Sequence, residues 1–538
     1  MSRKLERGII LRIVVARILA AVLFLAVCGA AAVAQAPDTL EARIQKVMAR
    51  PEFARSNFGI EFYDLETGKV IYALNAEKLF VPASTTKLLT EGTVLAKLGP
   101  DYRFHTRMYR TGPIDKHGTL KGNLILVASG DPNLSNRIQA DGTLAFVDED
   151  HSYNGPALPG DPLGVIKDFA AQVAAKGIRK IEGRMYVDTS LMPDGQREGG
   201  TGVTMSSIIV NDNILDLTAK PGEKVGDPVA FEVSPQTSYF HFINALTTGP
   251  ANSKLSYDVT DPAARPDGSW EINFSGNVPQ GSGLHTLAYQ IPSPTQFTTW
   301  VLREALQAKG TEIKPKKSDA LLKDFSSFQH FYNSEYQVAE HVSPPLSEEI
   351  KITLKVSQNL HAGMGPYYLG LFVGKNAKDP LSTGFKIEHA FLMDAKLDLS
   401  GASQGDGEGG DWADLFSPDF MCHYLAYWKT RPDFAIFFNG LPILGKDGTL
   451  AKIQKDNPGA GHVFAKTGTF AAEDKLNSRL MLNGKGLAGY VQTKSGKTLA
   501  FAAYVNHTSM PADPESAQKI AGQALGEIAA AAYDVPLP

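Results

Sequence analysis

Cysteine is almost absent from this sequence. Only Cys28 and Cys422 occur among 538 residues, so a chain of this size must be stabilised by a packed core and not by a set of disulfides. Cys28 lies in an N-terminal segment that we expect to be removed, which leaves Cys422 without a partner. Cys422 lies in the apolar stretch 420–425, and we interpret it as a small buried hydrophobic residue.

A strong charge of one sign and metal-binding motifs are also missing. The formal net charge is -4 at pH 7, spread along the chain without the basic stripe that nucleic acids require, so no nucleic-acid partner is expected. There is no His-Glu-x-x-His and no cluster of cysteine with histidine. We therefore predict no metal and no cofactor, and interpret His105, His423 and His462 as structural or surface residues.

The main uninterrupted apolar run lies near the N-terminus. Basic residues precede the run Ile18–Val27, and Ala32-Val33-Ala34 forms a small-x-small cleavage signal. The run is shorter than the roughly 20 residues of a membrane helix. Residues 1–36 are therefore predicted to be a secretory signal peptide, with an uncleaved anchor as the alternative. We expect an exported protein of the periplasm or cell envelope, with no strong membrane anchor after cleavage.

The two ends of the remaining chain carry patterns of a sheet packed on helices. Alternating apolar and polar residues predict hairpins over 59–74 and 489–505, and helical spacing predicts a helix over 84–98. The glycine-rich acidic stretch 401–410 is interpreted from its composition as a flexible, solvated connection.

The middle of the chain is predicted to be an insertion. Residues 106–335 contain many short β-like runs separated by turn signals. We predict a discontinuous catalytic domain of residues 37–105 and 336–538, interrupted by this mostly β accessory region, which we expect to hold two nested β-rich domains.

Ser84-Thr85-Thr86-Lys87 opens the predicted helix. Its spacing puts both polar ends on one helix face, so an amine can take the proton of the hydroxyl. The helix dipole also favours negative charge developing on the serine. Taken alone, Ser-x-x-Lys is more often a helix cap followed by a surface lysine. The roles of Ser84 as nucleophile and Lys87 as base therefore depend on the other motifs.

Lys466-Thr467-Gly468-Thr469 follows a predicted strand and supplies a second lysine. A lysine acts as a base only when burial or a nearby positive charge lowers its pKa, and Lys466 can provide that charge. Lys466 is also expected to bind an anionic group such as a terminal carboxylate, assisted by Thr467. Gly468 would let a substrate backbone pair with the strand edge.

Ser357-Gln358-Asn359 is the third element. Ser357 could relay a proton, and the Asn359 amide could hold both Lys87 and a substrate carbonyl. By itself, Ser-x-Asn is usually a loop or a cap.

In this order, the three motifs resemble those of the D-alanyl-D-alanine carboxypeptidase/endopeptidase family, the class C low-molecular-mass penicillin-binding proteins. The resemblance implies an α/β (α+β) catalytic domain of the serine β-lactamase/transpeptidase type, in which an antiparallel sheet packs against helices. It also implies a serine hydrolase acting on peptidoglycan stem peptides through an acyl-enzyme on Ser84, without a cofactor, and inhibited by β-lactams. The N–H groups of Ser84 and Thr469 would form the oxyanion hole, and Thr467, Gly468 and Thr469 would bind substrate.

This chain departs from the family pattern in three places. The second motif usually continues as Ser-Asp-Asn-Leu-x-Ala-Glu, whereas here Gln358 stands in its centre and Gly363 follows His361-Ala362. The family also tends to carry Asp-Gly-Ser-Gly-Leu-Ser, whereas here residues 398–403 run into the acidic glycine stretch. The acidic insert residue that related enzymes use to hold a substrate amino group has no clear match. Asp194 and Asp212 are candidates.

Alternative functions remain open at this stage. The departures would suit a catalytically weak murein-binding protein, and the same serine chemistry would suit a β-lactamase, although no local motif announces the deacylating group that a β-lactamase needs. Carboxypeptidase and endopeptidase activities also stay open, because they use the same chemistry and differ only in what the cleft admits.

Overall fold

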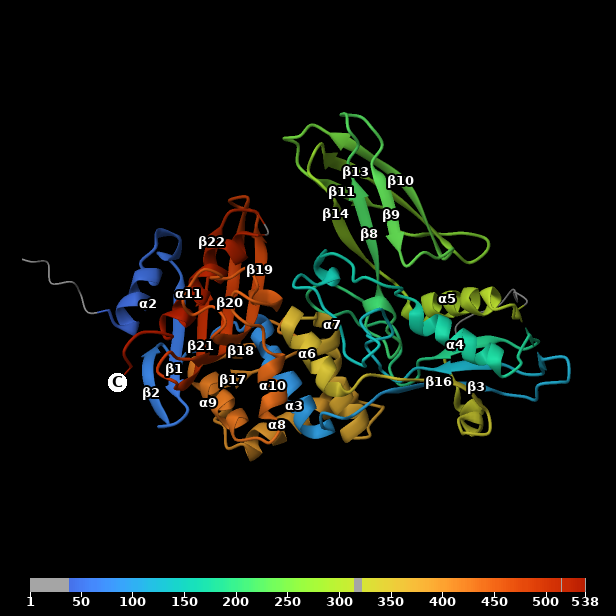
Figure 1. Ribbon diagram of the computed structural model, residues 1–538, viewed down its shortest axis with the longest axis horizontal. Coiled ribbons are helices and arrows are strands. Elements are labelled where there is room, and N and C mark those ends of the chain that lie inside the picture. Colours follow the sequence, from blue (N-terminus) through green and yellow to red (C-terminus); the bar gives the residue numbers. More distant parts are fainter. Residues whose placement is uncertain (1–37, 314–321, 514, 538) are drawn as a thin grey trace, which may run out of the picture.

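The computed structural model describes residues 38–313, 322–513 and 515–537 (Figure 1). The predicted signal peptide lies outside the described residues. Figure 1 shows a sheet with helices built from the two ends of the chain, and further sheets built from its middle. Within the described ranges, no helix is both long and apolar enough to span a bilayer.

The sheet of the chain ends is antiparallel, with the order β19-β20-β21-β1-β2 and β22 paired to β20. Strand β1 lies between β2 and β21, so the first and last parts of the chain share one sheet. Strand β19 is an edge, and its third-motif residues can therefore face a ligand. The strands are β1 (Asn57–Asp64), β2 (Lys69–Leu74), β19 (Val463–Asp474), β20 (Arg479–Gln492), β21 (Thr498–Asn506) and β22 (Thr508–Met510).

Helices cover both faces of this sheet. On one face, α2 (Leu40–Met48), the π-helix Ala517–Gly522 and α11 (Gln523–Ala531) bury residues such as Ile44 and Ile528 against Phe62 and Phe501. On the other face, Leu88 and Trp428 join a second core with Tyr490. The helices of that face are α3 (Lys87–Leu98), α6 (Leu346–Val356), α7 (Asn359–Tyr368), α8 (Pro380–Asp394), α9 (Pro418–Lys429) and α10 (Phe434–Gly440). This antiparallel sheet packed with helices confirms the predicted fold class.

Cys422 is a free thiol in helix α9 and is fully buried. Its Sγ lies 3.6 Å from the carbonyl oxygen of Glu61 in β1. The interpretation of Cys422 as a buried hydrophobic residue is confirmed.

The middle of the chain builds a sheet with the order β16-β3-β5-β7, covered by helices α4 (Gly164–Ala175) and α5 (Pro294–Ala308). A small sheet with the order β15-β6-β4 lies in the same part of the chain. The strands are β3 (His105–Arg110), β4 (Thr119–Leu120), β5 (Leu124–Val127), β6 (Lys180–Ile181), β7 (Met185–Asp188), β15 (Glu312–Ile313) and β16 (Gln337–Val342). The domain boundaries drawn from the sequence stay a prediction.

Two further sheets form the lobe drawn in green in Figure 1. One has the order β14-β8-β9, and in the other β10 runs parallel to β13, which also pairs with β11 and β12. The strands are β8 (Ile214–Lys220), β9 (Ala230–Ser234), β10 (Phe240–Gly249), β11 (Ser256–Val259), β12 (Ala263–Ala264), β13 (Trp270–Pro279) and β14 (His285–Gln290). Together with the sheet under α4 and α5, this lobe shares one hydrophobic core.

Candidate active site

Ser84 lies in the short 3-10 helix Ala83–Thr86 that leads into α3. Its neighbours Thr85, Thr86 and Lys87 are fully buried, whereas Ser84 is partly exposed. Lys87 Nζ donates to Ser84 Oγ at 2.7 Å and to Asn359 Oδ1 at 2.6 Å. The buried amine is therefore in hydrogen-bond contact with the one accessible hydroxyl of this turn.

Ser357 lies between helices α6 and α7 and joins the two lysines. It has the left-handed backbone conformation, with φ 64° and ψ 34°, which non-glycine residues adopt rarely. Lys466 Nζ donates to Ser357 Oγ at 2.7 Å, and Lys87 Nζ lies 3.3 Å from the same oxygen. Tyr153 of the insert donates its hydroxyl to the Ser357 carbonyl at 2.6 Å. A proton path thus links Lys87 and Lys466 through one hydroxyl.

The third motif lies on the edge strand β19. A Cβ added at Gly468 would come 2.3 Å from the Pro82 carbonyl oxygen and 3.1 Å from the Ser84 nitrogen. Only glycine lets the strand approach the Ser84 turn this closely. Thr467 Oγ1 donates to Thr449 Oγ1 at 2.9 Å. The strand therefore lies directly beside the turn that carries Ser84.

Burial sets the charge of the lysines. It lowers the pKa of Lys87 to about 8, while nearby carboxylates, Glu408 first, act in the opposite direction. Burial and the charges of Lys87 and Lys485 lower the pKa of Lys466 well below its usual value. A lysine whose pKa is about 8, such as Lys87, is partly neutral near neutral pH, and the neutral amine is the form that can act as a general base.

A cleft of about 730 Å³ opens at these motifs. The sequence-predicted residues that line it are Ser84, Ser357, Asn359, Thr467 and Thr469. Its other walls come from residues that the sequence interpretation did not single out: Asp148, Glu149, Tyr153 and Gly200 of the insert, together with Lys452 and Lys485. Lys485 Nζ donates to Thr469 Oγ1 at 2.5 Å. The acidic triplet 148–150 was a visible signal for the insert wall, but its position at the cleft depends on the folded insert.

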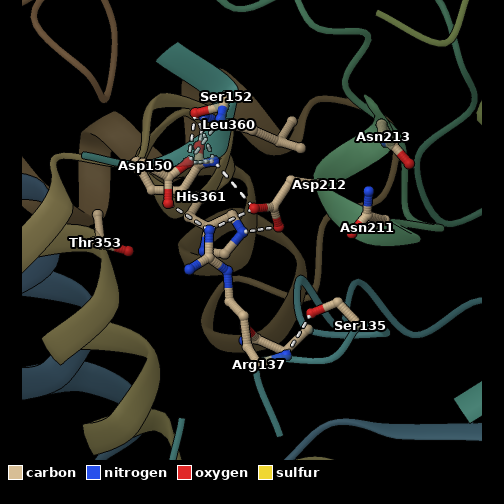
Figure 2. Close-up of polar contacts among 12 residues, drawn as sticks. Ser135, Arg137, Asp150, Ser152, Asn211, Asp212, Asn213, Thr353, Leu360 and His361 are labelled. Carbon is tan, nitrogen blue, oxygen red and sulfur yellow. Dashed lines mark hydrogen bonds and ion pairs between the residues drawn. The ribbon is translucent and has the colours of Figure 1, made fainter. Parts of the chain in front are cut away.

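A buried ion cluster ties the insert to the second motif. Figure 2 shows Arg137 reaching between Asp150 and Asp212, to which its Nη2 donates at 2.5 and 2.6 Å. His361 of α7 contacts Asp212 at 3.0 Å and Glu349 of α6 at 2.8 Å. Burial opposes these charges, but Arg137 and His361 hold the pKa of Asp212 well below its usual value, and Glu349 and Asp212 raise that of His361 to about 10.

Gln358, the centre of the second motif, is part of this cluster. Its Nε2 lies 3.3 Å from Asp150 Oδ1 and 3.3 Å from Asp212 Oδ2, and 3.1 Å from Ser152 Oγ. Its Oε1 accepts from the Leu360 N–H at 2.8 Å and caps helix α7. An aspartate at position 358 would place a third carboxylate next to Asp150 and Asp212, and the three negative charges would repel one another. The uncharged Gln358, which departs from the family pattern, instead donates hydrogen bonds to these two insert carboxylates.

Neither Asp194 nor Asp212 lines the cleft. Asp194 accepts from Ser293 Oγ at 2.8 Å and Thr295 Oγ1 at 2.6 Å at the start of α5, and Asp212 is 1% exposed inside the ion cluster. Both carboxylates are held by contacts within the protein, away from the cleft lining.

The acidic glycine stretch is not a solvated connection, and this correction brings it to the active site. Asp406 accepts the N–H groups of Glu408, Gly409 and Gly410 at 2.9, 2.6 and 2.9 Å. Glu408 is 4% exposed, and a Cβ at Gly409 would lie 2.1 Å from the Ala83 carbonyl oxygen. The part of this stretch that lies beside the Ser84 turn is therefore the loop Asp406-Gly407-Glu408-Gly409, through Gly409. Composition alone could not show this close packing.

Two groups of side chains within the described ranges have the composition of a cation site. In the group of Asp150, His151 and Asp212, the Arg137 guanidinium already contacts both carboxylates, so positive charge is supplied by the protein. The other group, Glu61, Asp419 and His423, has no member in the cleft.

Comparison with known proteins gives consistent similarities. The model of the D-Ala-D-Ala carboxypeptidase 3 (S13) family matches residues 40–525. A D-alanyl-D-alanine carboxypeptidase of Actinomadura sp. (strain R39) is 25% identical over 490 residues, which cover 87% of this chain and 81% of the relative.

Solved structures are similar along most of the chain. Penicillin binding protein 4 (dacB) of Haemophilus influenzae superposes with a TM-score of 0.69 at 21% identity, covering 90% of this chain and 97% of the other. A structure of the same protein complexed with a β-lactam has a TM-score of 0.65 at 20% identity, covering 90% and 98%. At these identities the likeness shows a shared fold.

Proposed function

Since the chain belongs to the D-Ala-D-Ala carboxypeptidase 3 (S13) family, we propose that it hydrolyses D-alanyl-D-alanine ends or cross-links of peptidoglycan stem peptides through an acyl-enzyme on Ser84. One observation carries the proposal: the fully buried Lys87 Nζ donates to the accessible Ser84 Oγ at 2.7 Å. A nucleophile with its base in contact is the signature of covalent catalysis. Such substrates lie outside the cytoplasm, in agreement with the predicted export signal.

Acylation begins with proton transfer from Ser84 Oγ to the neutral Lys87 Nζ. The Oγ then bonds to the scissile carbonyl carbon, and the carbonyl electrons move to its oxygen. The N–H groups of Ser84 and Thr469 would stabilise that oxyanion. The proximity of β19 to the Ser84 nitrogen supports this pairing.

Ser357 completes the exchange of protons. Its Oγ contacts both Lys87 and Lys466, so it can pass a proton to the leaving amine as the carbon–nitrogen bond breaks. Asn359 holds Lys87 through its Oδ1. Water then attacks the acyl carbon and gives a proton to Lys87, which passes it to Ser84 Oγ as the ester bond breaks and the peptide leaves with a new carboxyl group.

The cleft walls suit an anionic terminus and a cationic side group. Lys466, Lys485 and Thr469 would bind a terminal carboxylate, the last two directly from the cleft. On the insert side, Asp148 and Glu149 are exposed residues of the cleft wall. Glu149 pairs with Lys452 at 2.5 Å, and Asp148 Oδ1 accepts from the Gly448 N–H at 2.7 Å. The negative charge of Asp148 would attract an amino group of the stem peptide. We assign to Asp148 the role for which Asp194 and Asp212 were candidates, because Asp148 lines the cleft.

Intact-protein mass spectrometry after incubation with penicillin tests the proposal. We expect a stable adduct of one penicillin on the wild-type protein and none on Ser84→Ala. Rapid turnover of penicillin would indicate a β-lactamase, and no adduct would indicate a murein-binding protein. Digestion of purified monomeric and dimeric muropeptides then separates carboxypeptidase from endopeptidase activity.

A further inference from the structure

Glu408 is a buried carboxylate that the mechanism above does not use. It lies in the loop between β17 (Ala402–Ser403) and β18 (Leu415–Phe416), and its Oε1 accepts a hydrogen bond from the Gly199 N–H of the insert. Asp406 holds the same turn through the backbone N–H groups of the loop. Asp406 thus holds the backbone at Glu408, and Gly199 holds its carboxylate.

The Glu408 carboxylate occupies space that a side chain at position 363 would need. A Cβ added at Gly363 of α7 would lie 2.5 Å from Glu408 Oε2. Gly363 stands where the resembled pattern has glutamate, and Glu408 stands where Asp-Gly-Ser-Gly has serine. In this chain the loop residue Glu408 thus fills the space in which a side chain at position 363 of the helix would begin.

A series of packing contacts and hydrogen bonds connects Glu408 to Lys87. Gly200, next to the residue that Glu408 binds, lies against Asn359, because a Cβ at Gly200 would come 1.8 Å from Asn359 Nδ2. The Oδ1 of the same Asn359 accepts from Lys87 Nζ at 2.6 Å. The Glu408 loop, the Gly199–Gly200 turn and the Asn359 amide thus contact one another in series, and the Asn359 amide contacts Lys87 Nζ.

We propose that Glu408 is a positioning residue for Lys87, which seats the Gly199–Gly200 turn against Asn359 and stabilises the ammonium form of Lys87. The inference rests on the acyl-enzyme mechanism proposed above. During acylation the proton moves from Ser84 Oγ to Lys87 Nζ, and Glu408 neither gives nor receives it. Burial and the charge of Asp406 raise the pKa of Glu408 to about 8, so this carboxyl is charged in only part of the molecules at neutral pH. Its ionised form compensates the new positive charge on Lys87 in a buried place, where such an interaction is strong.

Several charged groups face the two residues. The carboxylates with the largest effects on Lys87 are Glu408, Asp406, Glu198 and Glu91, and Lys466 is a neighbouring basic group. Those acting on Glu408 include Asp406, Glu198 and Lys87, with the hydroxyls of Tyr153 and Tyr367 nearby. Among the carboxylates, Glu408 has the largest effect on Lys87. Removing its charge should therefore lower the pKa of Lys87 despite the remaining groups.

The first test is the pH dependence of acylation by a fluorescent penicillin, measured on the full chain between about pH 5.5 and 9.5. Glu408→Gln keeps an acceptor for Gly199 and removes the charge, and we expect the acidic limb of the profile to move down by about 0.5 to 1 pH unit. Asp414→Asn is the matched control, because Asp414 is a buried carboxylate of the same loop that is not among the four with the largest effects on Lys87. An unchanged limb in Glu408→Gln, at an unchanged melting temperature, would overturn the proposal.

The second test returns the carboxylate to the helix. Gly363→Glu alone should slow acylation by about tenfold or more, because Glu408 blocks its side chain, whereas Gly363→Glu combined with Glu408→Ser should recover most of the rate and the wild-type limb. Additive losses in the double variant would overturn the inference. If the wild-type protein is never acylated, the proposed function itself fails. A labelled wild-type protein with insensitive variants contradicts only the role of Glu408.

Discussion

Gln358 donates its side-chain amide toward Asp150 across the boundary between the second motif and the insert, at 3.3 Å. The same nitrogen lies 3.3 Å from Asp212, and both carboxylates bind Arg137. The loop that carries Ser357 and Asn359 is therefore held by residues of the middle of the chain. The insert is part of the active-site framework as well as a wall of the cleft.

Gln358→Glu hardly changes the size of the side chain, but we expect it to lower both the stability of the protein and the rate of acylation. It replaces two donated hydrogens by a third carboxylate, so we expect a loss of about 2 to 4 kcal/mol in the free energy of unfolding and at least about tenfold slower acylation. The new carboxyl would have a raised pKa because of burial and its neighbours. Both losses should therefore shrink as the pH falls toward 5 and grow toward 8.

Thermal melts and penicillin labelling at the two pH values measure this effect. Gln358→Met is the control, because it removes the hydrogen bonds without adding a charge and should lack the pH dependence. Equal behaviour of the two variants would contradict the role given to Asp150 and Asp212.

Lys485→Met is expected to weaken recognition of a terminal carboxylate. Lys485 lines the cleft and holds Thr469, and burial lowers its pKa to about 8, so below that pH it is mainly charged. We expect KM for stem peptides with a free carboxylate to rise about tenfold, the scale of one charge-assisted hydrogen bond. Steady-state kinetics on free and amidated peptides check this. The same rise on both would contradict it.

Gly468→Ala is expected to separate strand β19 from the nucleophile. The new methyl would meet the Pro82 carbonyl oxygen at 2.3 Å, so the strand must shift, and a shift of this kind can slow acylation by about 100-fold. Gly164→Ala is a control with no atom within 4 Å of the added methyl. Acylation rates and circular dichroism melts are the measurements. A normal rate in Gly468→Ala would show that the approach of β19 is not needed.

Acylation should accelerate with rising pH. Burial lowers the pKa of Lys87 to about 8, and the base must be neutral to take the Ser84 proton. The rate constant should therefore rise about tenfold per pH unit below pH 8 and level off above it. Stopped-flow mixing with a chromogenic β-lactam gives the profile. A flat profile between pH 6 and 8 would exclude Lys87 as the titrating base.

The sequence was informative where chemistry depends on neighbours in the chain. Ser84 and Lys87 are three positions apart at a helix start, and the hairpin β1–β2 needs only a local turn, so both were predictable. The antiparallel sheet followed from the resemblance. The second lysine expected near Lys87 is Lys466, and both amines contact Ser357 Oγ. The main cause of the lowered Lys87 pKa is burial.

Long-range packing was not predictable. The acidic residues around Asp148 are visible in the sequence, but their position near Ser84 could not be predicted, because it depends on how the insert folds. The acidic glycines suggested a solvated loop, but Gly409 is needed for contact with Ala83, and Asp406 satisfies backbone N–H groups that composition cannot reveal. Lys485 has no motif, since it reaches the cleft through the pairing of β20 with β19.

The position of β1 between β2 and β21 has a consequence for the order of folding. Ile60 of β1 pairs with Ala503 of β21. Strand β1 therefore lacks its partner β21, and the sheet beside Ser84 is incomplete, until almost the whole chain has been synthesised. Contacts of such long sequence separation form slowly, whereas β3, β5 and β7 can pair much earlier. The middle of the chain can thus fold before the strands of the two ends pair. A newly made, partly emerged chain would hold no reactive serine, and activity would arise only when the last strands add to the sheet.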